Sequence, residues 1–189
     1  MFFKFMKKVA QVLAFMLFRF DVRGMENIPE SGPYLLCCNH ISALDPVVLA
    51  VFMKRQPRFM GKKELFGNPF LNWFFRKLGA FPVDRKVADM QAFRSSMDVL
   101  KEGHGLLIFS QGTRMKEFES AKGGVALFGL RSGAPIIPVG IKGSYKFRSK
   151  IQIRVGEPIS MEPYAGMKVK TELIEQVMEV VVKKVSELT

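Results

Sequence analysis

Residues 34–52, YLLCCNHISALDPVVLAVF, contain the pattern that decides the fold. The apolar run from Tyr34 to Cys38 is short and predicts a buried strand, and the run from Asp45 to Phe52 is typical of a helix. Pro46 disfavours helical geometry in the residue before it and suits a first helical position, so a turn must separate the two runs. A strand, a turn and a helix in this order indicate an α/β unit.

The same alternation continues to the C-terminus. We expect further strands at residues 58–61, 79–83, 106–109, 136–141 and 151–155, and further helices at residues 70–77, 89–102, 123–131 and 171–188. This order predicts an α/β fold, a single layered domain with a mixed, partly parallel sheet flanked by helices, whose ligands bind beyond the strand ends. No repeat and no Pro-, Gly- or Ser-rich linker divides the chain, so residues 24–189 are expected to form one domain.

Charge is the unusual feature of the composition. Lys and Arg number 29 against 17 acidic residues, a formal net charge of +12. Such a field attracts nucleic acid, acidic protein, anionic lipid or phosphorylated metabolites. The aromatic residues are 18 Phe with one Trp and three Tyr. We expect nearly all of them to lie in apolar runs rather than exposed beside Lys or Arg, which argues against nucleic acid.

The two cysteines, Cys37 and Cys38, are adjacent in the sequence. An ordinary disulfide between neighbours would be strained, and we therefore expect a reduced protein that faces the cytosol. No Cys-x-x-Cys pair is present to form a zinc or redox site. We expect no metal and no cofactor.

Residues 1–23 are expected to form a separate N-terminal segment, an amphipathic helix at a membrane interface. The charge-free stretch from Val9 to Phe18 would reach about 15 Å as a helix, roughly half a hydrocarbon core, so it cannot span a bilayer. One stripe holds the side chains expected to contact the membrane: Phe2, Phe5, Met6, Val9, Val12, Leu13 and Met16. A signal peptide is disfavoured because charged residues replace a small-residue cleavage site, whereas packing of this helix on its own domain stays open.

The densest group of polar residues is Asn39-His40-x4-Asp45-Pro46, between the first expected strand and its helix. On a continuous helix His40 and Asp45 would point about 140° apart, but a turn can bring them together. A carboxylate that holds one imidazole nitrogen leaves the other nitrogen as a base, as in a catalytic triad without its serine. The alternative, in which Asp45 only caps the helix and His40 only fills space, stays open on these two residues alone.

Basic and glycine-bearing segments follow other expected strands. Ser110-Gln111-Gly112-Thr113-Arg114 can turn backbone N–H groups, a hydroxyl and a guanidinium toward an anion. Arg85 and Lys62 follow two further strands, at what would be the same edge of the sheet. Any single cation could be merely solvated, but the group beside a His–Asp pair favours a phosphate-bearing substrate that reacts at a hydroxyl.

In order along the chain, five blocks resemble those of the 1-acylglycerol-3-phosphate acyltransferases. The blocks are Asn39-His40-x4-Asp45-Pro46, Gly61-Lys62-Lys63-Glu64-Leu65-Phe66, Phe81-Pro82-Val83-Asp84-Arg85, Phe109-Ser110-Gln111-Gly112-Thr113-Arg114 and Ile137-Pro138-Val139-Gly140. The resemblance covers roughly residues 25–160. Ordered blocks of this kind are far more specific than His-x4-Asp alone.

The resemblance implies acylation of the sn-2 hydroxyl of lysophosphatidic acid to phosphatidic acid, on the cytoplasmic face of the cell membrane. It makes His40 the general base, Asp45 the residue that orients it, and acyl-CoA or acyl carrier protein the thioester donor. It assigns the Ile-Pro block to the acyl side and the acceptor phosphate to Lys62, Arg85, Gly112, Thr113 and Arg114. An anionic membrane surface is a further expected partner, and nucleic acid is not.

One block departs from the family pattern. The family usually has Phe-Pro-Glu-Gly-Thr-Arg, whereas this chain has Ser110 and Gln111 before Gly112. Glutamine retains hydrogen bonding and loses the charge, which leaves open another lyso-lipid or glycerol-3-phosphate as acceptor. A non-catalytic binder of anionic membranes or nucleic acid is the alternative from another class.

Overall fold

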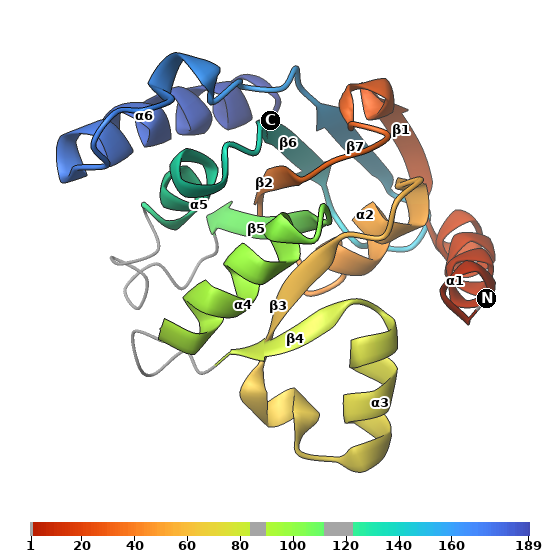
Figure 1. The fold of residues 1–189 in the computed structure, drawn as a ribbon. Helices are drawn as coiled ribbons and strands as arrows, with labels where there is room; N and C mark the ends of the chain where they lie inside the picture. The colour runs from red at the N-terminus through yellow and green to blue at the C-terminus, as the bar shows by residue number, and fades with distance from the viewer. Residues whose placement is uncertain (1, 84–89, 112–122) are drawn as a thin grey trace.

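A seven-stranded sheet forms the middle layer of the molecule, and helices cover both of its faces (Figure 1). The computed structural model describes residues 2–83, 90–111 and 123–189. The strands are β1 (Arg19–Arg23), β2 (Tyr34–Asn39), β3 (Arg58–Lys62), β4 (Ala80–Val83), β5 (Gly105–Gln111), β6 (Ile136–Gly143) and β7 (Lys150–Val155). The helices are α1 (Phe2–Leu17), α2 (Asp45–Phe52), α3 (Pro69–Lys77), α4 (Met90–Lys101), α5 (Gly124–Ser132) and α6 (Thr171–Glu187), with short 3-10 helices η1 (Met25–Asn27), η2 (Lys63–Phe66) and η5 (Glu162–Tyr164).

The expected α/β domain with a mixed sheet is confirmed. Every strand and helix predicted from residue 34 onward is present, with the described ends displaced by two residues or fewer. The agreement follows from the clear change of hydrophobic period between strands and helices along this part of the chain. Asp89, the first residue of the helix expected at residues 89–102, lies outside the described residues.

Strand β2 lies at the centre of the core. Leu35 and Cys37 pack on one face with residues of α4, α5 and α6, and Tyr34, Leu36 and Cys38 pack on the other face with α2. All five are fully buried. A parallel strand that is covered on both faces needs apolar side chains throughout, which explains the unbroken run. The two cysteines therefore belong to different faces of the sheet.

The strand order makes neighbours of β2 and β5, and the helices that follow these two strands lie on opposite faces of the sheet. The sheet runs β1-β7-β6-β2-β5-β3-β4, and its neighbours are parallel except for the antiparallel pair β6 and β7. Strands β2, β3, β4 and β5 therefore end at one edge. Helix α2 follows β2 on one face, whereas α5 follows β5 on the other. Neighbouring strands whose connections leave to opposite faces form the crevice in which α/β proteins bind ligands.

The N-terminal segment differs from the expectation. Helix α1 ends at Leu17, and Arg19–Arg23, assigned from sequence to the helical segment, form strand β1 beside β7. Phe18, Phe20 and Val22 pack against the core, so these residues alternate with the period of a strand. The apolar stripe of α1 runs directly into this alternation, which conceals the boundary in the sequence.

Candidate active site

The turn between β2 and α2 is held together by one buried carboxylate. Asp45 is the first residue of α2, and Pro46 lies in the first turn of that helix. Asp45 Oδ2 accepts hydrogen bonds from the backbone N–H groups of Ile41 and Ser42, both at 2.8 Å. The side chain is fully buried, and its hydrogen bonds offset the cost of removing the carboxylate from water. Asp45 thus bonds backward into the turn and does not cap α2.

The same carboxylate oxygen also orients the imidazole of His40. Asp45 Oδ2 lies 2.8 Å from His40 Nδ1, while the His40 side chain keeps a third of its surface exposed. The ring of Phe109, on β5, lies 4.3 Å from the imidazole between centroids and is tilted by 35° to it. Because a carboxylate only accepts hydrogen bonds, Nδ1 carries a proton and Nε2 presents a lone pair. The two residues singled out in the sequence therefore meet in the geometry of a base and its orienting group.

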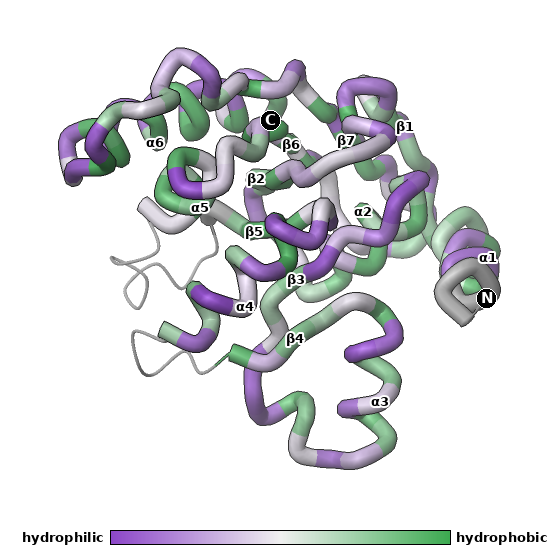
Figure 2. The backbone as a smooth tube through the Cα atoms, in the orientation of Figure 1, coloured by the Kyte–Doolittle hydropathy of each residue, from purple (hydrophilic) through white to green (hydrophobic). Residues whose placement is uncertain are grey.

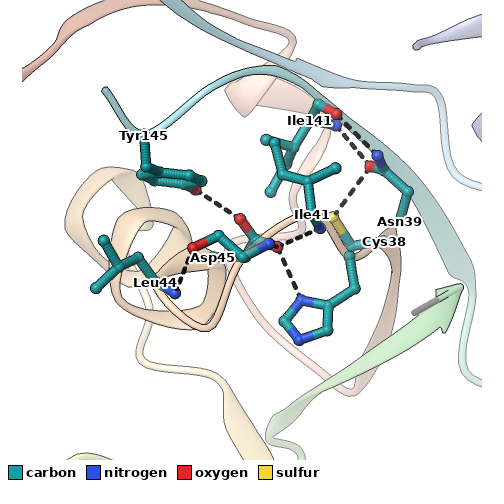
Figure 3. A network of polar contacts seen from close by, with 9 residues as sticks. Cys38, Asn39, Ile41, Leu44, Asp45, Ile141 and Tyr145 are labelled. Atoms are coloured by element: carbon teal, nitrogen blue, oxygen red, sulfur yellow. Dashed lines mark hydrogen bonds and ion pairs between the residues drawn. The ribbon is translucent and has the colours of Figure 1, made fainter. Parts of the chain in front are cut away.

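The second carboxylate oxygen has a partner that the sequence did not indicate. The Tyr145 hydroxyl donates a hydrogen bond to Asp45 Oδ1 at 2.6 Å, and Figure 3 shows Asp45 between Tyr145 and Ile41. Burial, and then this hydrogen bond, raise the pKa of Tyr145 well above its usual value. The hydroxyl therefore stays protonated and remains a donor. Tyr145 follows β6, 100 residues after Asp45, and no local pattern marks it.

Asn39 ties the start of the turn to the neighbouring strand. Its Nδ2 donates to the Ile141 carbonyl at 2.8 Å, and its Oδ1 accepts from the Ile141 N–H at 2.7 Å (Figure 3). The last backbone pair of β2 and β6 is Cys38 with Val139, so this side chain continues the ladder beyond it. The residue before His40 is thus fixed by two hydrogen bonds.

Only one of the expected phosphate ligands lies within the described residues. Lys62 is the last residue of β3 and is more than half exposed, with its Nζ 3.4 Å from Glu64 Oε1. The strands β4 and β5 end at the same edge, at Val83 and Gln111. The other expected ligands lie outside the described residues: Arg85, Gly112, Thr113 and Arg114. Within the described part of the chain, no three His, Cys, Asp or Glu side chains are grouped to hold a metal ion.

Helix α1 is attached through the polar side chains of Lys7 and Gln11 and through the buried Ala14. Gln11 Nε2 donates to the Val51 carbonyl at 2.9 Å, and Lys7 Nζ donates to the Met53 carbonyl, so both side chains satisfy carbonyls at the C-terminal end of α2. Burial lowers the pKa of Lys7.

The apolar stripe of α1 faces outward. Its described members, including Val12 at 54% exposure and Met16 at 68%, are exposed; these are Val9, Val12, Leu13 and Met16. The side chains of Phe2, Phe5 and Met6 lie outside the described part. No helix among the described residues has the length and apolar character needed to cross a bilayer.

A family model for Acyltransferase matches residues 19–142, which include the turn from His40 to Asp45. The chain belongs to the acyltransferase family. The chain is 29% identical over 177 residues to a protein of Bacillus subtilis named 1-acyl-sn-glycerol-3-phosphate acyltransferase. This match covers 90% of this chain and 89% of the relative. The acyltransferase of the same name from Streptococcus pneumoniae is 33% identical over 150 residues, covering 75% of this chain and 56% of the relative.

Among solved acyltransferase structures, the 1-acyl-sn-glycerophosphate (LPA) acyltransferase PlsC from Thermotoga maritima resembles this chain. The TM-score is 0.71 at 27% identity, and the match covers 98% of this chain and 79% of that one. The likeness extends over both the sheet and the helices.

Proposed function

We propose that this protein transfers an acyl chain from a thioester donor to the sn-2 hydroxyl of 1-acylglycerol-3-phosphate, giving phosphatidic acid. The observation that carries the proposal is the 2.8 Å contact between His40 Nδ1 and Asp45 Oδ2, beyond the carboxyl end of β2. Membership of the acyltransferase family and relatives named for this reaction support it.

The reaction needs a base because a glycerol hydroxyl is a poor nucleophile with a high pKa. His40 Nε2 takes the hydroxyl proton as the oxygen attacks the thioester carbonyl. The C–O bond forms, the C–S bond breaks through a tetrahedral intermediate, and the imidazolium returns the proton to the departing thiolate. The Asp45 carboxylate stabilises the transient positive charge on the ring. No enzyme nucleophile is required because the thioester is already activated, and Ser42 Oγ instead accepts a hydrogen bond from the Leu44 N–H at 3.2 Å.

The acceptor phosphate is proposed to bind at the edge where β3, β4 and β5 end. The residues proposed to hold it are Lys62, Arg85, Gly112, Thr113 and Arg114. Binding the phosphate at a fixed distance from His40 lowers the entropic cost of bringing the hydroxyl to the base. Arg114→Ala should therefore raise KM for the acceptor more than KM for the donor, and equal effects on both would contradict the phosphate role.

The chain provides a matched control for the catalytic test, because it has only two histidines. His40→Ala should lower kcat for acyl transfer to lysophosphatidic acid by about 10²–10⁴-fold, the range for loss of a general base. His104→Ala should leave kcat within about twofold, since His104 lies at the opposite end of the sheet, before β5. A thermal unfolding transition measured for each variant checks that both are folded. Near-native turnover by His40→Ala would refute the mechanism.

A different acceptor is the second candidate, because Gln111 stands where the family usually has a glutamate. A panel of lysophosphatidic acid, other lyso-lipids and glycerol-3-phosphate with one donor identifies the acceptor. The donor is proposed to be acyl-CoA or acyl carrier protein. Comparing both with the preferred acceptor decides between them.

We further propose that the protein binds peripherally to the cytoplasmic face of the membrane through α1. The exposed apolar face of α1 supports this, because its polar face already contacts α2. The proposed contacts are Phe2, Phe5, Met6, Val9, Val12, Leu13 and Met16. Val12→Ser/Met16→Ser should weaken co-sedimentation with anionic vesicles, whereas Val180→Ser/Val182→Ser, at exposed valines of α6, should not. Equal binding by the two variants would refute this anchor.

A further inference from the structure

A second exposed apolar surface lies beside β4, the outermost strand on the side of the sheet away from β1. It belongs to the segment from Lys62 to Lys77, which we name the α3 lobe. Phe70 is 67% exposed and Trp73 is 48% exposed. Their ring centroids are 6.1 Å apart. Lys77 follows one turn later on the same side of α3, since positions i, i+3 and i+7 share a helix face. The outer side of the lobe is therefore aromatic with a basic end.

The opposite side of α3 packs on Phe66, and Phe66 in turn joins the lobe to β3. The rings of Phe75 and Phe66 lie 5.9 Å apart, and the guanidinium of Arg76 lies 5.9 Å from the Phe66 ring centre. Phe66 covers Gly61 of β3 so closely that a Cβ there would lie 2.9 Å from the ring. The packing of the lobe thus uses Phe66 and Phe75, whereas about half of the Trp73 side chain and two thirds of the Phe70 side chain are exposed.

The charge of the α3 lobe indicates what it binds. Residues 62–77 contain four basic residues and one acidic residue, a net charge of +3. Figure 2 shows the hydrophobic residues of α3 flanked by hydrophilic ones. The exposure of Phe70 and Trp73 close to Arg76 and Lys77 differs from the expectation that the aromatic residues lie in apolar runs. Exposed Phe and Trp near Lys and Arg are the composition of segments that lie in a lipid interface, where the indole ring is stable at headgroup level and cations attract anionic lipids.

We propose that the α3 lobe is a second membrane contact, in which Phe70 and Trp73 enter the interface of a bilayer that contains anionic lipid. The proposal rests on the proposed function, which takes its acceptor from a membrane. Lys62 is at the carboxyl end of β3, and the parallel strand β2 ends on the same side of the sheet, where it leads into His40. An inserted α3 lobe would hold these strand ends near the headgroups, where the phosphate of a lipid acceptor lies.

Trp73 provides the test because it is the only tryptophan of the chain. The full chain is mixed with phosphatidylcholine vesicles with or without phosphatidylglycerol. Anionic vesicles should shift the Trp73 emission to shorter wavelength, and lipids brominated on their acyl chains should quench it. Phe70→Ser should lower the partition coefficient about tenfold, the effect of withdrawing one phenyl ring from an apolar phase.

Two further variants complete the design. Lys77→Gln should weaken binding to anionic vesicles about fivefold and leave neutral vesicles unaffected. Met167→Ser is the matched control, because this side chain is 54% exposed and lies outside the α3 lobe. It should leave the Trp73 signal unchanged.

Two results would overturn the proposal. Co-sedimentation with anionic vesicles without any change in Trp73 emission would mean that the α3 lobe stays in water. A shift in the wavelength of Trp73 emission with acyl carrier protein but not with vesicles would mean that the α3 lobe binds a protein instead of a membrane. The experiment measures no turnover, so its failure is distinguishable from failure of the proposed reaction, which the His40→Ala assay reports.

A separate observation concerns the Asp45 carboxylate oxygen that does not contact His40. Asp45 Oδ2 is shared by three donors, and Oδ1 accepts from Tyr145 at 2.6 Å. The ring of Tyr145 is held in turn by Phe18, between α1 and β1, with ring centroids 5.5 Å apart and an interplanar angle of 87°. A carboxylate bonded at both oxygens cannot rotate without breaking a hydrogen bond.

We infer that Tyr145 is a positioning residue that fixes the Asp45 carboxylate and, through it, the imidazole of His40. Tyr145→Phe keeps the ring against Phe18 and removes only the hydroxyl. It should lower kcat about tenfold, the lower end of the loss of a hydrogen bond to a charged group, with KM for both substrates within about twofold.

A double-mutant cycle separates this role from a merely structural one. If Tyr145 acts through Asp45, Asp45→Asn/Tyr145→Phe should be no slower than Asp45→Asn alone. Tyr164→Phe, in η5, is the matched control and should leave kcat unchanged. Multiplicative losses in the cycle, a changed acceptor KM, or a Tyr145→Phe variant with normal kcat would each overturn the inference.

Discussion

Replacing Asp45 by Asn separates the charge of the carboxylate from its shape. The carboxylate accepts three hydrogen bonds at Oδ2 and one at Oδ1. An amide nitrogen at the Oδ2 position would face three donors, whereas at the Oδ1 position it would face only the Tyr145 hydroxyl, which can rotate to accept. We therefore expect the amide oxygen to keep the Oδ2 position, so that the turn and the His40 tautomer survive.

The loss is then electrostatic. Nδ1 and Oδ2 are 2.8 Å apart, which puts the centres of the imidazolium and carboxylate charges about 4 Å apart, and at an effective dielectric constant of about 20 their attraction is about 4 kcal/mol. That attraction exists only while the ring carries the proton, so its loss raises the barrier. Asp45→Asn should therefore lower kcat by about 10³-fold. KM should change little because Asp45 is fully buried, which keeps it out of reach of a bound substrate.

The assay is the release of thiol from acyl-CoA, or formation of phosphatidic acid with an acyl carrier protein donor, at saturating lysophosphatidic acid. Asp45→Ala is the contrast, because it leaves all four donors without their acceptor and should destabilise the fold by several kcal/mol. Asp45→Asn should lose far less stability. An Asp45→Asn variant within tenfold of wild-type kcat, beside an inactive His40→Ala, would refute the electrostatic role of the carboxylate.

Three further predictions concern the scaffold around the site. Gly105→Ala places a Cβ 2.1 Å from Tyr34 Cζ and should lower stability by about 1–3 kcal/mol, a fall in Tm of several degrees; an unchanged Tm would contradict this packing. Asn39→Ala removes both hydrogen bonds to Ile141 and should cost about 2 kcal/mol in urea unfolding together with a lower kcat, and full activity would show that this anchor is dispensable. Hydrogen bonds from two basic residues of β7 hold the pKa of Asp21 well below its usual value, so its stabilisation is complete above pH 4 and is lost as the pH falls further. The Tm difference between wild type and Asp21→Asn should therefore be largest near neutral pH and shrink toward pH 2, and a difference that grows on acidification would contradict the assignment.

The elements from β2 to α6 could be predicted from local patterns: β2 is a short unbroken apolar run, whereas α4 and α6 repeat apolar residues on one helical stripe. The turn from His40 to Asp45 could be predicted for a similar local reason: Pro46 sets the start of α2, and the five-residue spacing lets the carboxylate reach back to the imidazole. Short-range geometry thus determines both the fold class and the central pair of the site. The strand β1 escaped prediction, because Phe18 and Phe20 continue the apolar run of α1.

Other features depend on contacts between distant parts of the chain. Tyr145 and Ile141 reach Asp45 and Asn39 only because β6 pairs with β2, and strand order is not written in any local pattern.

The sequence by itself determined that α1 has a polar and an apolar face, but not which of them contacts the protein. Tertiary structure decided it: Lys7 and Gln11 donate to carbonyls at the end of α2 and Ala14 is buried, so that Val12, Leu13 and Met16 are left exposed. Local periodicity is a property of neighbouring residues, whereas burial depends on what the rest of the chain brings against them.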